Sequence, residues 1–251
     1  MELESQIESQ HIFGNFRQYY AFHPVSSRLD VLPRGAFRQL WESHGRPSVF
    51  SICDVGCNEG ELTLGMGERA RAELPPQTEI VLLGVDLDPV LIARASTRAA
   101  GSSTVKAFFV ALDIMEEKAA VALSAAVDVV LAPFGGKAKF NLVTLWSITM
   151  WIHLNHGESG LSKFLQLGAE LTEGSLLVEP QEKKSYKTAA KRLRKLGLAA
   201  HPHCINNKVL DGIEEHVVGQ LRPLFDGQEE WKLGEDLAWG RSIVIFTRPF
   251  L

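Results

Sequence analysis

Glycine and aspartate residues follow apolar runs in the first half of the chain, and together they could hold a nucleoside. The run Val49–Val55 leads into Asp54-Val55-Gly56-Cys57-Asn58-Glu59-Gly60, a D-x-G-x-x-x-G pattern. Two further apolar runs end at Asp86 and at Asp113-Ile114. The first carboxylate can accept hydrogen bonds from ribose hydroxyls, and the second can accept one from an adenine amino group. The order glycine loop, Asp86, Asp113 therefore favours an adenosine-containing ligand.

The glycine loop lacks the middle glycine of the dinucleotide-binding fingerprint, and Asn58 stands there instead. Gly56 permits a tight turn, and Gly60 lets the following helix start close to the strand. A pyrophosphate needs close backbone approach at the middle position, whereas S-adenosylmethionine does not. The loop favours S-adenosylmethionine over a nicotinamide cofactor. Taken singly, the loop could be a plain strand–helix turn, and each aspartate a helix N-cap.

Metal and disulfide chemistry are not expected. The chain has three cysteines, and Cys53 and Cys57 have no second pair at zinc-ligand spacing. An odd count argues against a disulfide framework, so reduced, buried thiols are expected. His153 and His156 are three residues apart, but neither has a carboxylate or cysteine partner at useful spacing.

The charge is slightly acidic overall and strongly basic in one place. Lysine and arginine number 26 against 30 acidic residues, for a net charge of −4. No acidic residue interrupts the segment from Lys183 to Lys195, in which Lys187, Lys191 and Arg194 recur at helical spacing. Such a segment could hold a phosphate backbone. It could equally be a solvated helix face, and both interpretations stay open.

Apolar runs alternate with amphipathic segments after residue 34. This alternation predicts a doubly wound α/β fold, Rossmann-like, with a mostly parallel seven-stranded sheet. Residues 1–34 form an aromatic arm that we expect to contribute to the active site, and residues 35–251 form the catalytic domain. The expected strands are Val49–Val55, Ile80–Asp86, Val105–Leu112, Phe140–Leu145, Ser175–Glu179 and Ser242–Arg248, with Trp231–Leu237 beside the last.

The expected helices are Gly35–Ser43, Glu59–Leu74, Pro89–Ala100, Met115–Ala126, Leu161–Leu171, Lys184–Leu196 and His216–Leu224. No apolar run reaches the roughly 20 residues that cross a bilayer. Met1 to Gln10 carries no secretory signal pattern. We therefore expect a cytoplasmic protein without membrane contact.

Several stretches resemble one known family. Ser147 to Gly157 (SITMWIHLNHG), Leu176 to Gln181 (LLVEPQ) and Lys191 to Leu198 (KRLRKLGL) are similar to the bicoid-interacting-protein family, which contains the methylphosphate capping enzymes of small RNAs. Asp54 to Asn58 and the arm from Phe13 to Leu29 also fit. The chain looks closest to the short branch, whose members methylate the 5′-monophosphate of tRNA and of microRNA precursors. The resemblance implies a class I S-adenosylmethionine-dependent RNA methyltransferase.

The resemblance also implies roles for individual residues. Besides Gly56 and Gly60, the residues expected to contact S-adenosylmethionine are Arg28, Asn58, Asp86, Leu87, Asp113, Ile114 and Trp146. Those expected near the phosphate are Asn15, Tyr19, His153 and Asn155, and the RNA backbone would lie on Lys187, Lys191 and Arg194. In one departure, Glu182-Lys183 stands where the family usually has Pro-Trp, so no aromatic ring is available for stacking at position 183.

No catalytic acid or base is assigned, because a terminal phosphate has a second pKa of about 6 and is already mostly dianionic at neutral pH. The expected partner is a small RNA with a 5′-phosphate, bound by a monomer that does not use DNA. Two other interpretations remain: a methyltransferase that acts on a protein or small molecule, and a non-catalytic RNA-binding domain that retains the fold.

Overall fold

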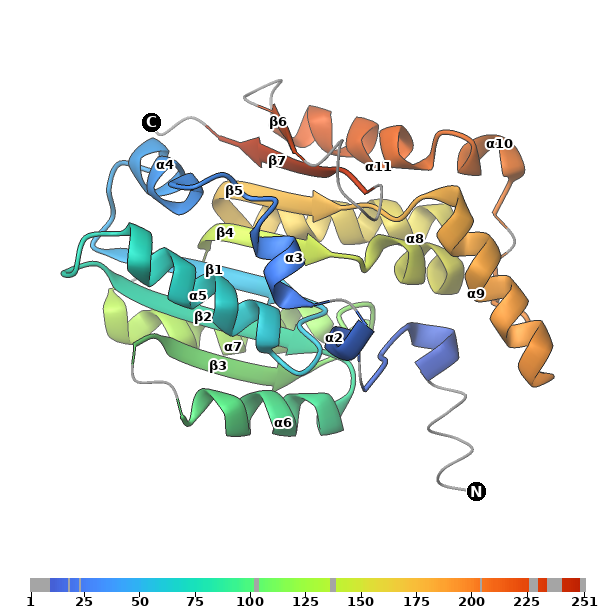
Figure 1. Cartoon of the computed structure of the whole chain (residues 1–251), viewed down its shortest axis with the longest axis horizontal. Coiled ribbons are helices and arrows are strands. Elements are labelled where there is room, and N and C mark those ends of the chain that lie inside the picture. Colours follow the sequence, from blue (N-terminus) through green and yellow to red (C-terminus); the bar gives the residue numbers. More distant parts are fainter. Residues whose placement is uncertain are drawn as a thin grey trace.

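A mixed sheet forms the centre of the computed structural model, which describes residues 10–17, 19–22, 24–101, 104–135, 139–203, 205–225, 230–233 and 241–248 (Figure 1). Its seven strands have the order β3-β2-β1-β4-β5-β7-β6. The strands are β1 (Val49–Val55), β2 (Glu79–Asp86), β3 (Lys106–Ala111), β4 (Phe140–Trp146), β5 (Thr172–Glu179), β6 (Glu230–Leu233) and β7 (Ile243–Thr247).

The direction of the strands confirms the expected fold. β1 pairs in parallel with β2 on one side and with β4 on the other. Strands β3 and β5 continue the parallel array, and only β7 runs antiparallel to its neighbours β5 and β6. The strand order reverses between β1 and β4, and at such a switch point the loops after the two strands diverge and leave a crevice.

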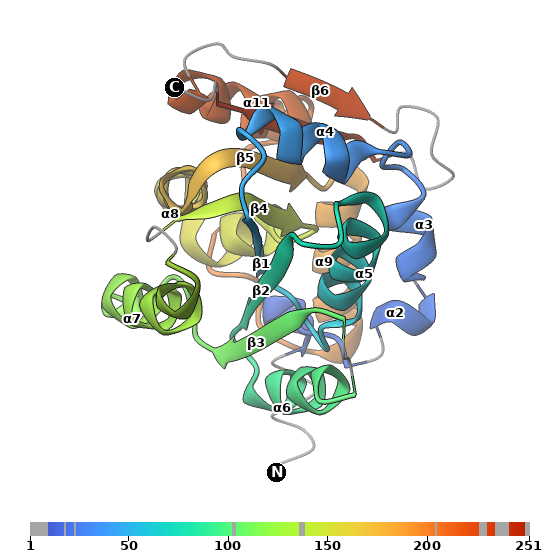
Figure 2. The ribbon, with the colours of Figure 1, turned by 90° about the vertical axis from the view of Figure 1, so that its left-hand side faces the viewer.

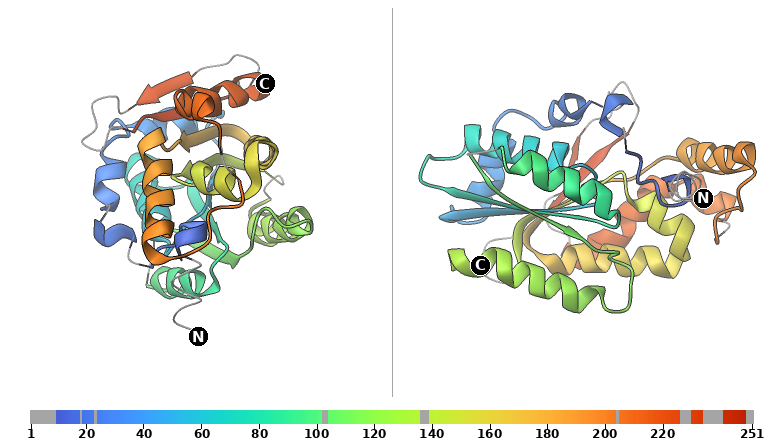
Figure 3. Two further views of the ribbon diagram at one scale, coloured as in Figure 1. Left: turned by 90° about the vertical axis from the view of Figure 1, so that its right-hand side faces the viewer. Right: turned by 90° about the horizontal axis from the view of Figure 1, so that it is seen from below.

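Helices cover both faces of the sheet (Figure 3). Helices α4 (Ala36–Ser43), α5 (Glu61–Glu73) and α6 (Pro89–Ala99) lie on one face, and α7 (Ala119–Leu131), α8 (Thr149–Leu171) and α11 (Ile213–Leu221) lie on the other. Figure 2 shows the short helices α2 (Tyr19–Phe22) and α3 (Val25–Leu29) beside α5. The remaining helical elements are η1 (Ala132–Phe134), α9 (Lys183–Leu196), α10 (Asn207–Leu210) and η2 (Arg222–Phe225).

Strand β1 explains why the core has two halves. Phe50 and Ile52 point into the cluster packed under α4 and α5, whereas Cys53 and Val55 point into the cluster packed under α7 and α8. A strand buried on both faces carries apolar residues on both, as this one does, apart from Ser51 and Asp54. Cys53 and Cys57 are free, buried thiols, as expected.

Two helices begin far from the residues at which the sequence predicts their start. Helix α8 starts at Thr149 rather than Leu161, and it kinks at Gly157, whose φ of 66° and ψ of −170° are not helical. Helix α7 starts at Ala119 rather than Met115. There the carboxylate of Asp113 accepts a hydrogen bond from the backbone N–H of Met115 (2.9 Å), which forms a turn before the helix.

The C-terminal part agrees broadly with expectation. Helix α11 begins three residues before the predicted His216, and α10 was not predicted. Strand β6 pairs with β7, as expected for the segment at Trp231. Residues 234–237, which we also predicted to be strand, lie outside the described residues. Over the ranges that the structure describes, no helix is both long and apolar enough to span a bilayer.

Gly157 offers a test of the kink in α8. A Cβ at this position would lie 2.9 Å from the ring of His203, and the backbone conformation suits glycine. We expect Gly157→Ala to lower the free energy of unfolding by about 1–3 kcal/mol. Gly219→Ala is the matched control, because α11 has open space at that position. It should stabilise the protein by about 0.5–1 kcal/mol in urea unfolding. Equal unfolding midpoints for Gly157→Ala and the wild type would contradict the argument.

Candidate active site

Two adjoining cavities open at the carboxyl end of the parallel strands. The first, with about 820 Å³ of empty space including its mouth, is lined by the glycine loop, the ends of β2 and β4, and the arm. The second has about 1940 Å³ and lies between the arm and α9. Tyr19, Ser147 and Trp151 line both. A ligand in one cavity would therefore lie directly beside a ligand in the other.

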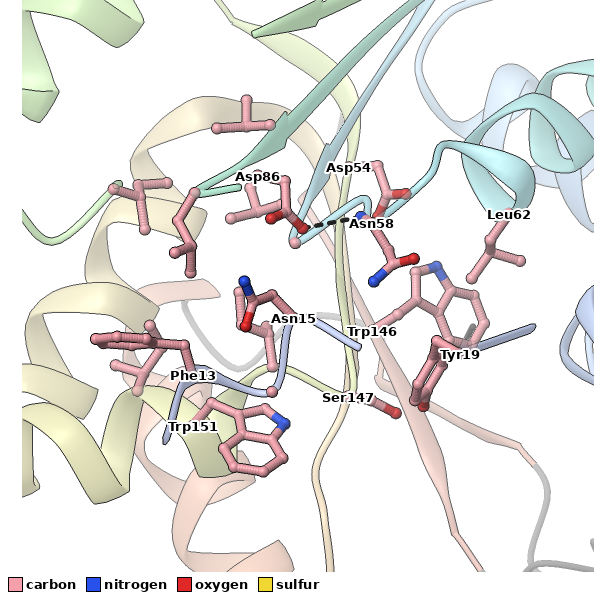
Figure 4. A pocket seen from close by; sticks show the side chains of 18 of the residues that line it. Phe13, Asn15, Tyr19, Asp54, Asn58, Leu62, Asp86, Trp146, Ser147 and Trp151 are labelled. Atoms are coloured by element: carbon pink, nitrogen blue, oxygen red, sulfur yellow. Dashed lines mark hydrogen bonds between the residues drawn. The ribbon is translucent and has the colours of Figure 1, made fainter. Parts of the chain in front are cut away.

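The glycine loop is bound to the end of β2 through Asp86 (Figure 4). One carboxylate oxygen of Asp86 accepts a hydrogen bond from the backbone N–H of Asn58 (2.9 Å), and the other accepts from that of Asp88 (3.0 Å). Asn58 has a φ of 52°, which asparagine tolerates better than most residues. Burial raises the pKa of Asp86 to about 6. The carboxylate is thus shielded from water but still lines the cavity.

Gly56 and Gly60 have the roles that the sequence predicts. Their φ angles are 79° and 74°. A Cβ at Gly56 would lie 2.8 Å from Ile148, and one at Gly60 would lie 2.9 Å or less from Phe109 and Ala95. A side chain at either position would be strained by the positive φ and would have to displace these neighbouring side chains.

Gly60 does not line the first cavity, whereas the other expected cofactor residues do. Leu87 and Ile114 offer apolar surface beyond the ends of β2 and β3, and Asp113 lines the cavity with them. Trp146 is buried at the end of β4, and its indole N–H has no hydrogen-bond partner among the described residues. The structure thus brings together Arg28, Gly56, Asn58, Asp86, Leu87, Asp113, Ile114 and Trp146.

The arm closes over the first cavity. Asn15 is buried there and donates its amide N–H to Asp88 (3.0 Å), and Asn58 donates to the carbonyl of Phe16 (3.0 Å). Asn155 donates to the carbonyl of Ile12 (2.9 Å). We call these three hydrogen bonds the arm latch. Asn15 and Asn155 were expected near the phosphate. Asn15 lies in the first cavity, and Asn155 holds the arm backbone without lining either cavity.

Gly14 fits the arm against α8. Its φ is 78°, and a Cβ there would lie 2.2 Å from the ring of Trp151. The arm backbone therefore lies directly on the indole, as Figure 4 shows for the segment between Phe13 and Asn15. The packing leaves no room for a side chain at this point.

Arg28 lies in a buried ionic network rather than on the surface. Its Nε is 3.4 Å from a carboxylate oxygen of Glu179, and its Nη2 donates to the hydroxyls of Tyr19 and Ser147. Burial lowers the pKa of Arg28, but the Glu179 carboxylate together with Tyr19 and Tyr20 outweighs this effect, and the pKa is raised. Arg28 stays charged where it lines the first cavity.

Cations gather around the second cavity. Those that line it are Arg17, Arg94, Lys184, Arg192 and Arg241. Figure 1 shows α9 extending past the carboxyl end of the sheet, next to the start of the arm. The guanidinium of Arg192 lies over the ring of Phe16, 4.9 Å from its centroid, which joins α9 to the arm.

The face of α9 that lines this cavity differs from the one predicted. Lys184, Thr188 and Arg192 recur every four residues and line the cavity. The expected Lys187, Lys191 and Arg194 are exposed on the same helix and line neither cavity. Spacing alone could not distinguish these faces, because the burial of Tyr186, Ala189 and Leu193 sets the rotation of the helix.

His153 also lies away from both cavities. It is fully buried, with Nδ1 at 3.1 Å from the hydroxyl of Tyr186 and Nε2 at 3.1 Å from Glu158. Burial lowers its pKa. The side chain connects α8 to α9, so its place in the structure is behind the second cavity rather than in it.

Ser147 and Gln181 were not predicted as site residues. Ser147 has a φ of 52°, unusual for a residue other than glycine. Gln181 accepts hydrogen bonds from the Thr149 hydroxyl and the Met150 backbone N–H (2.9 Å each) and donates to the carbonyl of Ser147. This glutamine fixes the turn between β4 and α8. Both residues fall within the stretches that carry the family resemblance.

Comparison with known proteins agrees with this architecture. The family model described as bicoid-interacting protein 3 (Bin3) matches residues 140–248. The pre-miRNA 5′-monophosphate methyltransferase of Danio rerio is 33% identical over 246 residues, which cover 94% of this chain and 92% of that protein. The RNA 5′-monophosphate methyltransferase of Homo sapiens is 35% identical over 240 residues, covering 93% and 80% respectively.

A solved structure shares the fold at low identity. The bifunctional kinase-methyltransferase WbdD superposes with a TM-score of 0.52 and 15% identity, over 89% of this chain and 42% of that one. The two chains therefore share this fold. Given the extent and identity of the match to the curated relatives, this chain belongs to the bicoid-interacting protein 3 family.

Proposed function

We propose that this protein transfers a methyl group from S-adenosylmethionine to the 5′-monophosphate of a small RNA. The observation that carries the proposal is the pair of adjoining cavities, one suited to a nucleoside and the other cationic, which meet at Tyr19, Ser147 and Trp151. The curated relatives are named for this reaction on RNA and on microRNA precursors. Transfer RNA is the other candidate substrate.

The residues of the first cavity fit S-adenosylmethionine. Asp86 offers a buried carboxylate to ribose hydroxyls, and Leu87 and Ile114 offer apolar faces to adenine. Arg28 offers a guanidinium, which suits the carboxylate of the methionine part. The indole N–H of Trp146, which has no acceptor among the described residues, fits a site whose ligand supplies one.

The protein's part in the reaction is alignment and exclusion of water. When bound, S-adenosylmethionine supplies a methyl group that is open to in-line attack. The phosphate is already anionic at neutral pH, so the protein needs no general base. The cations of the second cavity hold the phosphate, and the arm shields the junction of the two cavities from solvent. Alignment of this kind contributes several kcal/mol to catalysis.

The first test concerns the target atom. With labelled methyl donor, we expect transfer to a hairpin RNA that carries a 5′-phosphate and none to the same RNA with a 5′-hydroxyl. Mass spectrometry of the 5′ nucleotide gives the number of methyl groups added. Equal labelling of the two RNAs would move the target to a base or a ribose. If only a protein extract were labelled, the result would favour the interpretation as a protein methyltransferase. If no transfer were detected, it would favour the interpretation as a non-catalytic RNA-binding domain.

The second test concerns the pKa of Asp86. Because that pKa is raised to about 6, the carboxyl protonates as the pH falls through this value and then accepts hydrogen bonds poorly. Calorimetry should show weaker binding of S-adenosylmethionine below about pH 6. Asp86→Asn should weaken binding about tenfold or more at neutral pH. The variant should also abolish this pH dependence. The comparison controls for titration of the ligand, which would affect the wild type and the variant alike. An unchanged pH profile in Asp86→Asn would refute the assignment.

The third test compares two arginines of α9. Arg192 lines the second cavity, whereas Arg194, two residues later, does not. Arg192→Ala should weaken RNA binding about tenfold and lower the slope of log affinity against log salt by about one. Arg194→Ala should change affinity about twofold at most, as for an exposed charge. Equal losses in the two variants would show that the whole helix contacts the RNA and that the cavity face is not special.

A further inference from the structure

Glu179 lies between the two cavities and holds one arginine on each side. It is fully buried at the end of β5. One of its oxygens is 3.4 Å from Nε of Arg28, and the other is 3.5 Å from Nη1 of Arg241. Two guanidinium groups thus share one carboxylate, and Arg241 is one of the cations that line the second cavity.

The two arginines face different cavities. Arg28 lines the first cavity and not the second, whereas Arg241 lines the second and not the first. Their exposures differ accordingly. The side chain of Arg28 is 2% exposed, and that of Arg241 is 19% exposed. Arg241 comes from the segment just before β7, far along the chain from the arm and from α9.

Ser147 connects the arginines. Its hydroxyl accepts hydrogen bonds from Nη2 of Arg28 (3.0 Å) and from Nη1 of Arg241 (2.7 Å), and it donates to Glu179. Ser147 itself is fixed by the hydrogen bond from Gln181 to its carbonyl. The hydrogen bond and the ion pair of Arg241 both run through Nη1, and a guanidinium carries five N–H donors in a planar fork. These two contacts hold that end of the guanidinium in place before a ligand arrives.

We infer that Arg241 is a specificity-determining residue that binds the 5′-terminal phosphate, while Arg28 serves the anionic end of the methyl donor. Glu179 lies between the two arginines, and its single negative charge holds both guanidinium groups in place. This inference rests on the proposed function. A planar fork among the cations of the second cavity suits bidentate binding of a phosphate.

The test measures binding rather than turnover. A 3′-labelled hairpin RNA is prepared with either a 5′-phosphate or a 5′-hydroxyl, and fluorescence anisotropy gives its affinity for the full chain in the presence of S-adenosylhomocysteine. The wild type should prefer the phosphorylated RNA. Arg241→Gln, which keeps a donor for Ser147, should lose about tenfold of this preference, the effect of one charge-assisted contact. Its affinity for S-adenosylhomocysteine, measured by calorimetry, should be unchanged.

Two further variants serve as controls. Arg28→Gln should show the reverse pattern, with weaker binding of S-adenosylhomocysteine and a retained preference for the phosphate. Arg222→Gln removes an arginine that pairs with Glu215 and Glu230 and lines neither cavity, so it should alter neither affinity. Arg241→Lys keeps the positive charge that faces Glu179, so this variant should fold. It should lose part of the preference for the phosphorylated RNA, because lysine lacks the planar guanidinium fork.

The outcomes separate the inference from the proposed function. A full preference for phosphorylated RNA in both Arg241 variants would overturn the inference while leaving the proposed function intact. So would a loss of S-adenosylhomocysteine affinity in Arg241→Gln as large as in Arg28→Gln, because Arg241 would then be a structural partner of Glu179. A wild type that neither prefers nor methylates the phosphorylated RNA would remove the proposed function, and the inference with it.

Discussion

The reversal of strand order between β1 and β4 is the constraint on which the rest of the structure depends. Because β2 lies on one side of β1 and β4 on the other, the chain leaves β1 and β4 toward opposite faces of the sheet. The space between those exits cannot be filled by either crossover helix. The glycine loop, Asp86 and Trp146 all border that space, and the arm covers it. A sheet wound in one direction only would offer no such opening.

Charged side chains are buried beside this opening and depend on polar partners. Asp54 is fully buried in the same cavity wall, yet it accepts hydrogen bonds from the hydroxyls of Thr63 and Thr144. Burial raises its pKa, and the two hydroxyls act against this rise. Glu179 is likewise fully buried and depends on its arginines. Removing the sole partner of a buried charge costs about 3–5 kcal/mol, but Glu179 keeps one arginine when the other is replaced. Glu179 is therefore coupled to both cavities through its two arginines, one of which lines each cavity.

The sequence predicts the first cavity far better than the second. Gly56, Asp86 and Asp113 follow predictable strands, and in a parallel sheet the ends of neighbouring strands must meet at one edge. The second cavity depends on tertiary contacts that no local pattern encodes. Whether Lys184 or Lys187 faces it is decided by the packing of Tyr186 under α9. Arg241 reaches it only because β7 inserts between β5 and β6, which a run of apolar residues does not reveal.

Asn58 has a consequence beyond the loop in which it stands. A glycine there would leave the backbone path unchanged but would have no amide to offer the carbonyl of Phe16. The residue that departs from the dinucleotide fingerprint thus connects the glycine loop to the arm above it. Such a bond contributes about 1 kcal/mol. Because Asn58 also lines the first cavity, the wall of that cavity and its cover are joined through a single side chain.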